Sequence, residues 1–246
     1  MPQSILMQKL LHFPTELPVA TMEFNTGQGD RNSFKTEIRR LGLSEYTEED
    51  IEKFQVIHPI GNSFEGKGYL EDGTAYDLIA VSTDEVFNAF RTDDGYILFA
   101  DSKKAIIEHG IKRLVSGTAS FGEKRFHSDS ISINLRDLKE ELEQGALAQI
   151  KGGWWRDLQI ADVEVAYLGG GTVTESQYWS NYEESEGIIS ALRLEIPNPL
   201  VNDEDPTLKV LLTKEGNLVV YKKITNEKSL LDIAIPLFNL AKKHLE

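Results

Sequence analysis

The sequence predicts an α+β protein: antiparallel β-hairpins and a sheet, with short helices and a C-terminal amphipathic helix packed on one face of the sheet. Three observations predict it. Strand-like segments follow one another in residues 160–224, turn residues such as Asp72-Gly73 separate others, and one broad apolar face follows the last strand. Strands and long helices do not alternate regularly, which disfavours a doubly wound parallel sheet.

The N-terminal half mixes the two kinds of pattern. Leu6, Leu10 and Phe13 have helical spacing, although residues 1–13 could also pair as a strand. Asp72-Gly73 favours the positive φ angles of a tight hairpin turn. In chain order the remaining patterns predict a strand at 19–24, helices at 34–41, from Thr47 and at 83–90, a strand at 93–100, and a helix over 102–114.

The C-terminal half has clearer helix ends and more strands. Asn134 caps a helix that ends at Gly145, and Asn226 caps a final helix that contains Pro236 and therefore kinks. Lys214 to Asn217 form a hairpin turn. The predicted strands are residues 128–134, 160–168, 172–179, 187–196, 207–213 and 217–224.

A small, polar segment at 115–124 is the best candidate for a domain boundary. It divides the chain into an N-terminal α+β region, residues 1–117, and a C-terminal region of antiparallel sheet and helix, residues 118–246. The same segment could equally be a long loop, in which case the two regions form one continuous domain.

Composition restricts the classes of function. The chain has no cysteine, which excludes disulfides, thiolate nucleophiles and cysteine-ligated metals. No apolar run is long enough for a membrane span, and the first residues lack a signal-peptide pattern, so we expect a cytoplasmic protein. The net charge of −14 disfavours direct binding to nucleic acid. Residues 41–101 hold 14 acids and 3 bases, and residues 158–205 hold 10 acids and 1 base.

Three consecutive glycines at 169–171 are the nearest approach to a chemical motif. They match neither G-x-x-x-x-G-K-[ST] nor G-x-G-x-x-G, and the nearest charges are Glu164 and Glu175. A phosphate loop needs a helix N-terminus or a lysine behind it. The glycines therefore predict a tight or bulged connection between two strands, where positive φ or close backbone approach excludes a Cβ.

Aromatic side chains are dense on both sides of this turn. Trp154 and Trp155 are adjacent, and neighbours in a strand face opposite ways, so one of them is expected to be partly exposed. Tryptophan and tyrosine are enriched at binding hot spots. The alternative is that one tryptophan is core and the other lies along a sheet edge. The candidate binding residues are Trp154, Trp155, Tyr178, Trp179, Tyr182, Glu183 and Glu184.

No complete catalytic constellation is visible. The five histidines form no metal-ligand spacing, G-x-S-x-G is absent, and neither a cofactor nor a metal is predicted. The sequence therefore favours a non-enzymatic accessory or regulatory protein that binds another protein, a basic one in particular, through acidic and aromatic surface. The alternatives are an acidic nucleic-acid mimic that inhibits a DNA-binding enzyme, and a hydrolase that uses carboxylates with His58 or His127.

Overall fold

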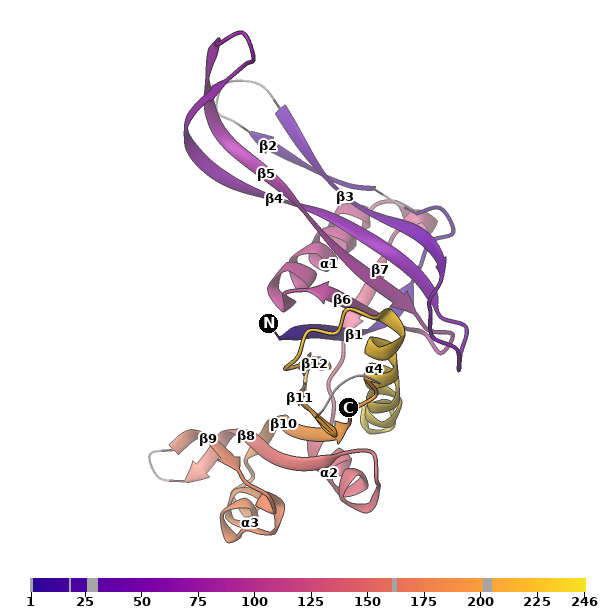
Figure 1. Ribbon diagram of the computed structural model, residues 1–246, viewed down its shortest axis with the longest axis vertical. Coiled ribbons are helices and arrows are strands. Elements are labelled where there is room, and N and C mark those ends of the chain that lie inside the picture. Colours follow the sequence, from indigo (N-terminus) through magenta and orange to yellow (C-terminus); the bar gives the residue numbers. More distant parts are fainter. Residues whose placement is uncertain (1, 18, 26–30, 161–162, 201–204) are drawn as a thin grey trace.

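A computed structural model describes residues 2–17, 19–25, 31–160, 163–200 and 205–246. It shows an antiparallel, sheet-rich α+β fold, as predicted, with four α-helices in these ranges (Figure 1). The elements are β1 (Gln3–His12), β2 (Val19–Asn25), β3 (Arg31–Leu43), β4 (Glu52–Tyr69), β5 (Ala75–Arg91), β6 (Tyr96–Ser102), α1 (Lys104–Thr118), β7 (His127–Ser130), α2 (Leu135–Gln144), β8 (Gln149–Ile160), β9 (Val163–Gly169), α3 (Gln177–Glu184), β10 (Ile188–Pro197), β11 (Thr207–Thr213), β12 (Asn217–Val220) and α4 (Glu227–Ala241).

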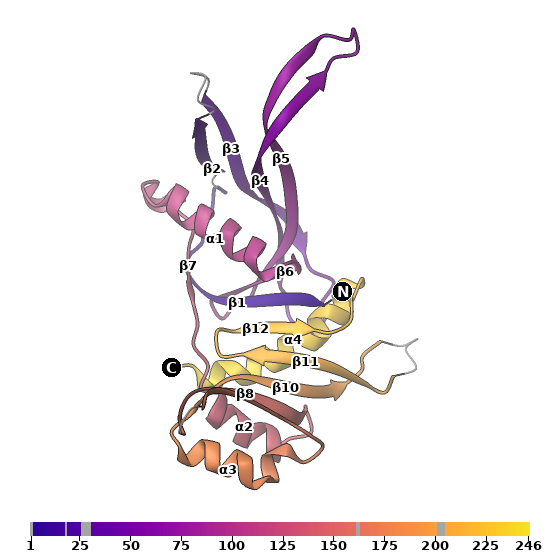
Figure 2. The same cartoon turned by 90° about the vertical axis from the view of Figure 1, so that its left-hand side faces the viewer.

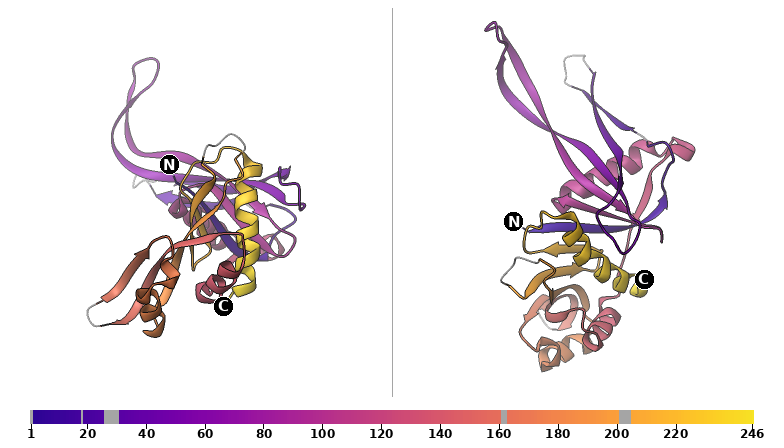
Figure 3. Two further views of the ribbon diagram at one scale, coloured as in Figure 1. Left: turned by 60° about the horizontal axis from the view of Figure 1, so that its bottom comes forward. Right: turned by 45° about the vertical axis from the view of Figure 1, so that its right-hand side comes forward.

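One sheet runs through both halves of the chain, in the order β2-β3-β4-β5-β6-β1-β12-β11-β10-β8-β9, and β7 also pairs with β1. Strand β1 is the junction, because it pairs with β6 on one edge and with β12 on the other. Helix α1 reaches Thr118 and so occupies the start of the segment that resembled a boundary. The β4–β5 hairpin extends from one end of the molecule, and β8, β9 and α3 lie at the other end (Figure 3).

The sheet has a separate core on each face. Alternation along β1 shows this, since Leu6 packs in the cluster under α1, whereas Ile5 and Met7 pack in the larger cluster that contains the apolar side of α4. Helix α4 therefore covers one face of the C-terminal strands, and α1 covers the opposite face of the N-terminal strands. Figure 2 looks onto β10–β12 from the side opposite α4.

Several local end signals are confirmed, although the helix start expected at Thr47 is not. The hairpin turn at Asp72-Gly73 is present, with Gly73 at φ +84°. The side chain of Asn134 accepts hydrogen bonds at the start of α2, Gly145 ends that helix, and Asn226 caps α4. No helix in the described ranges is long and apolar enough to cross a membrane.

Three predicted helices are wrong. Residues 34–41 and 83–90 belong to strands β3 and β5, and no helix begins at Thr47, since β4 starts at Glu52. For the two segments that are strands, the physical reason is that residues at i and i+4 share one face of a strand as well as of a helix. Residues 44–51, which include Thr47, form the loop between β3 and β4. The 1–13 segment, which was open between helix and strand, is strand β1.

The predicted strand 172–179 is also wrong, because residues 173–175 form a 3-10 turn and α3 follows. Ser176 caps α3 by accepting a hydrogen bond from the backbone N–H of Trp179. The alternation of large and polar residues in this short segment resembled a strand, and the cap outweighed it.

Helix α1 lies close to the sheet because small residues meet there. A Cβ added to Gly117 would lie 2.7 Å from the Cβ and 3.3 Å from the Cα of Ala20. We expect Gly117→Ala to lower the free energy of unfolding by about 1 to 2 kcal/mol, because overpacking outweighs the better helix propensity of alanine. Urea denaturation would measure it. Gly171→Ala is the matched control, since its Cβ meets nothing within 4 Å, and an equal loss there would contradict the packing explanation.

Candidate functional site

Strand β8 sends its two adjacent tryptophans to opposite faces, as the sequence predicted. Trp155 is fully buried and Trp154 is partly exposed. The ring of Trp155 meets that of Trp179, also fully buried, with ring centroids 5.2 Å apart. Two of the seven candidate residues, Trp155 and Trp179, therefore belong to the core between β8 and α3 and offer no surface.

The remaining candidates on α3 lie on the same face of the sheet as that core. Tyr182 is partly buried against Trp155, and Glu183 accepts hydrogen bonds from Trp179 Nε1 at 2.9 Å and from Lys139 Nζ at 3.2 Å. Tyr178 is 68% exposed and Glu184 is exposed on the outer side of the helix. The structure thus separates the acidic candidates from Trp154, which points away from α3.

A second aromatic group, not predicted as a site, forms around Trp154 on the bare face of the sheet. Tyr167 of β9 lies directly across from Trp154, and their ring centroids are 4.3 Å apart. Arg193 of β10 lies across from Gly152 and donates a hydrogen bond from Nη1 to the Tyr167 hydroxyl oxygen at 2.9 Å. We call Trp154, Tyr167 and Arg193 the open-face cluster.

The paired glycines of β8 make room for rings on both faces. A Cβ on Gly152 would lie 2.9 Å from the hydroxyl oxygen of Tyr167, and one on Gly169 would lie 2.8 Å from the Cζ of the same ring. On the other face, a Cβ on Gly153 would lie 2.7 Å from the ring of Trp179. The Tyr167 ring therefore lies over the strands, and 44% of the residue remains exposed.

The run Gly169–Gly171 does connect elements, though only partly as predicted. It joins β9 to the 3-10 turn before α3, not to another strand, and none of the three glycines has positive φ. Close approach of the Tyr167 ring is what Gly169 allows. A phosphate loop is not formed, because the backbone N–H of Gly170 is already donated to the carbonyl of Lys151.

The open face continues across the neighbouring strands. Strand pairing aligns Arg193 with Leu211, Leu211 with Val219, and Val219 with Ser4. Leu211 and Val219 are partly exposed there. Ser4 shares its side of β1 with Leu6, so the open face is on the same side of the sheet as α1.

Charges on the open face differ from those of the molecule as a whole. Lys151 and Arg156 pair with Glu195 and Glu215, at 3.7 Å and 3.3 Å. Arg193 and Lys209 have no carboxylate partner within the described part of the chain, and the Nε of Arg193 is buried without a hydrogen bond. Arg193 therefore has no ion-pair partner beside the Tyr167 ring, and Lys209 lies farther along β11, across from Glu195 but without an ion pair to it.

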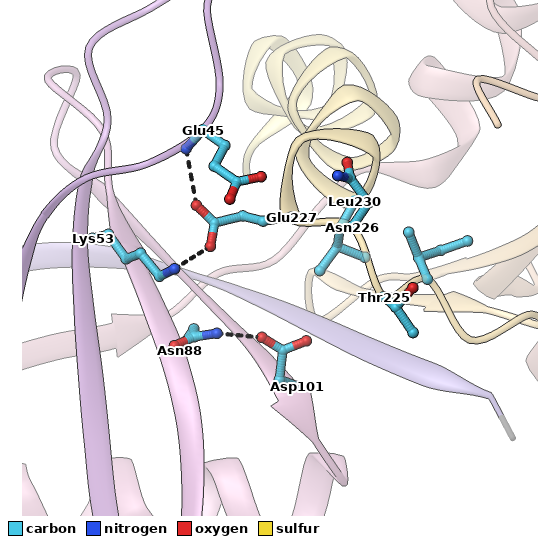
Figure 4. A pocket seen from close by; sticks show the side chains of 9 residues that line it. Glu45, Lys53, Asn88, Asp101, Thr225, Asn226, Glu227 and Leu230 are labelled. Atoms are coloured by element: carbon cyan, nitrogen blue, oxygen red, sulfur yellow. Dashed lines mark hydrogen bonds and ion pairs between the residues drawn. The ribbon is translucent and has the colours of Figure 1, made fainter. Parts of the chain in front are cut away.

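A polar cavity of about 320 Å³ lies between β4–β6 and the start of α4 (Figure 4). Glu227 pairs with Lys53 and accepts the backbone N–H of Glu45 at 2.9 Å. Asp101, at φ +75°, accepts hydrogen bonds from Asn88 Nδ2 at 2.5 Å and from Gln3 Nε2 at 2.7 Å. Glu227 therefore fastens α4 to β4 and to the loop before it, and Asp101 joins β6 to β5 and β1, so the cavity has a structural explanation.

The histidines are not brought to a carboxylate in a cavity. His58 is fully buried, and its two ring nitrogens bond to Thr36 Oγ1 and His109 Nδ1, each at 2.9 Å. Burial, together with His109 and Arg113 nearby, lowers the pKa of His58 to about 4. His127 lies 3.6 Å from Asp129 on strand β7, and four cavities lined by described residues have no histidine in their walls.

Metal ligation is similarly unsupported in the described ranges, where no group of three histidine, aspartate or glutamate side chains could hold an ion. Comparison with known proteins gives no family: no family model matches the chain, and no curated protein is similar to it in sequence.

Proposed function

We propose that this chain is a cytoplasmic accessory or regulatory protein that acts by binding, and that it holds its partner on the open face. The observation that carries the proposal is the open-face cluster, in which Tyr167 contacts both Trp154 and Arg193 on an uncovered part of the sheet. Tryptophan, tyrosine and arginine are the residue types most enriched at binding hot spots.

Exposed apolar side chains next to the cluster support this choice of face. A sheet face that meets only water usually carries polar side chains. Here Val165 of β9 and Ile188 of β10 lie on either side of Arg156 of β8, next to the cluster, and Val165 is 63% exposed. A contiguous apolar and aromatic surface with polar neighbours is typical of an interaction site.

A pull-down from native lysate tests the proposal. The wild type is compared with the double variant Trp154→Ala/Tyr167→Ala, and protein and nucleic acid are both quantified in the eluate. We expect one partner to be retained by the wild type and lost by the double variant. Tyr69→Ala, which removes an exposed tyrosine from the β4–β5 hairpin, is the control and should retain it. A partner retained equally by all three proteins would overturn the proposal.

A second candidate surface is the outer side of α3, where Tyr178 and Glu184 are exposed. Its acidic and aromatic character favours a basic protein partner. In the same pull-down, Tyr178→Ala/Glu184→Lys would then lose a partner that the open-face double variant keeps, because the two surfaces lie on opposite sides of the sheet.

A further inference from the structure

We propose that the partner of the open face is single-stranded nucleic acid, with bases stacked on Trp154 and Tyr167 and phosphates bound by Arg193 and Lys209. This inference rests on the binding function proposed above. It gives that function a ligand of defined chemistry: a planar base and an anionic backbone.

The ring geometry suits stacking. Tyr167 lies across the glycines at 152 and 169, so the ring extends over the strands beside Trp154. The guanidinium of Arg193 is fixed next to it by the bond from Nη1 to the tyrosine hydroxyl. Every base has a π-face, and aromatic rings or arginine planes on a sheet are the usual platforms for unpaired bases.

The net charge of −14 disfavours binding to nucleic acid, but the acids nearest the tryptophans in sequence do not lie on the open face. Glu183, Glu184 and Glu186 are near the tryptophans in sequence, but they belong to α3 and the turn after it, which pack over the opposite face of β8. Glu195 and Glu215 do lie on the strands of the open face or at their ends, and each is paired with a cation there. The open face is thus positive although the whole chain carries −14.

Charge complementarity alone would also fit an acidic peptide. Carboxylates of an acidic peptide would satisfy Arg193 and Lys209, but the two exposed rings would then need separate apolar or aromatic side chains of that peptide beside them. A nucleotide supplies both a ring and a phosphate, and Lys209 lies two residues along β11 from Leu211, which pairs with Arg193. The combination of rings and cations therefore favours nucleic acid over an acidic protein segment.

Fluorescence titration of the full chain with a short oligothymidylate tests the proposal. Trp154 is the one tryptophan with solvent exposure, so base stacking should quench its emission. With two phosphate contacts, a plot of the logarithm of the binding constant against the logarithm of the salt concentration has a slope of about −1.4. This slope corresponds to roughly a sevenfold loss of affinity between about 50 mM and 200 mM salt. The net negative charge of the chain makes low salt the correct starting condition.

Substitutions then locate the ligand. Trp154→Ala or Tyr167→Ala should each weaken binding about tenfold or more, measured by anisotropy of a labelled oligonucleotide. Lys209→Glu reverses the charge of an exposed side chain that lies across from Glu195, so its folding is checked by far-UV circular dichroism, and it should weaken binding and flatten the salt slope. Lys67→Glu on the β4–β5 hairpin is the matched control and should bind as the wild type does.

Three results would overturn the proposal: no saturable binding of oligothymidylate or oligouridylate at low salt, binding unaffected by Trp154→Ala and Lys209→Glu, or binding of polyglutamate in place of either oligonucleotide. If no oligonucleotide binds while the pull-down still recovers a protein that requires Trp154, the binding function stands and its ligand is a protein. If both experiments fail, both proposals fall.

Discussion

Replacing Trp179 by alanine is expected to lower the free energy of unfolding by about 3 to 5 kcal/mol, the range for removing a fully buried aromatic side chain. Trp179 is 0% exposed and lies edge-on to Trp155, with 77° between the ring planes. Its Nε1 donates to Glu183, and its ring lies against Gly153. Removing the ring would leave a cavity between β8 and α3. Urea denaturation followed by far-UV circular dichroism would measure the loss.

Two further variants separate the sources of this stability. Trp179→Phe keeps most of the apolar contact but loses the hydrogen bond to Glu183, so we expect a loss of about 1 to 2 kcal/mol. Trp154→Ala, on the open face, should cost less than Trp179→Ala because Trp154 is partly exposed. Equal losses for Trp154→Ala and Trp179→Ala would contradict the division of the aromatic residues into core and surface.

The contrast between Trp154 and Trp155 shows what the sequence could predict. Period-two alternation in β8 is a local rule, and it correctly separated Trp154 from Trp155. The Asn134 and Asn226 caps are local signals as well, and they were correct, whereas the helix start expected at Thr47 was wrong. The sheet-and-helix fold class followed from these local signals.

What the sequence did not predict depends on pairing between distant residues. Tyr167 contacts Trp154 and Arg193 only because of the registers of β8 with β9 and with β10. One usable signal was present: Arg193 is a lone cation in the apolar segment 188–196, where alternation puts it opposite the buried side. Because part of α3 was predicted to be a strand, the glutamates of this helix could not be assigned to one face of β8 from the sequence.

Acidification should destabilise the protein through the buried imidazole under α1. His58 is 0% exposed, and its pKa is lowered to about 4 by burial first, then by His109 and Arg113. On unfolding the pKa returns to about 6.5, so below that pH the unfolded state takes up a proton that the folded state does not. Stability is therefore fully present above about pH 6.5 and falls as the pH drops towards about 4, by about 3 kcal/mol over the whole range.

The measurement is the free energy of unfolding in urea between about pH 7 and pH 5, where about 2 kcal/mol of this loss should occur before most carboxylates titrate. His58→Gln keeps a donor and an acceptor for Thr36 and His109 but cannot take up a proton, so its pH profile should be flatter than that of the wild type. His127→Gln changes a partly exposed imidazole on β7 and should leave the slope as it is. A wild-type slope that survives in His58→Gln would show that other groups carry the acid sensitivity, and that His58 does not hold α1 to the sheet as a neutral ring.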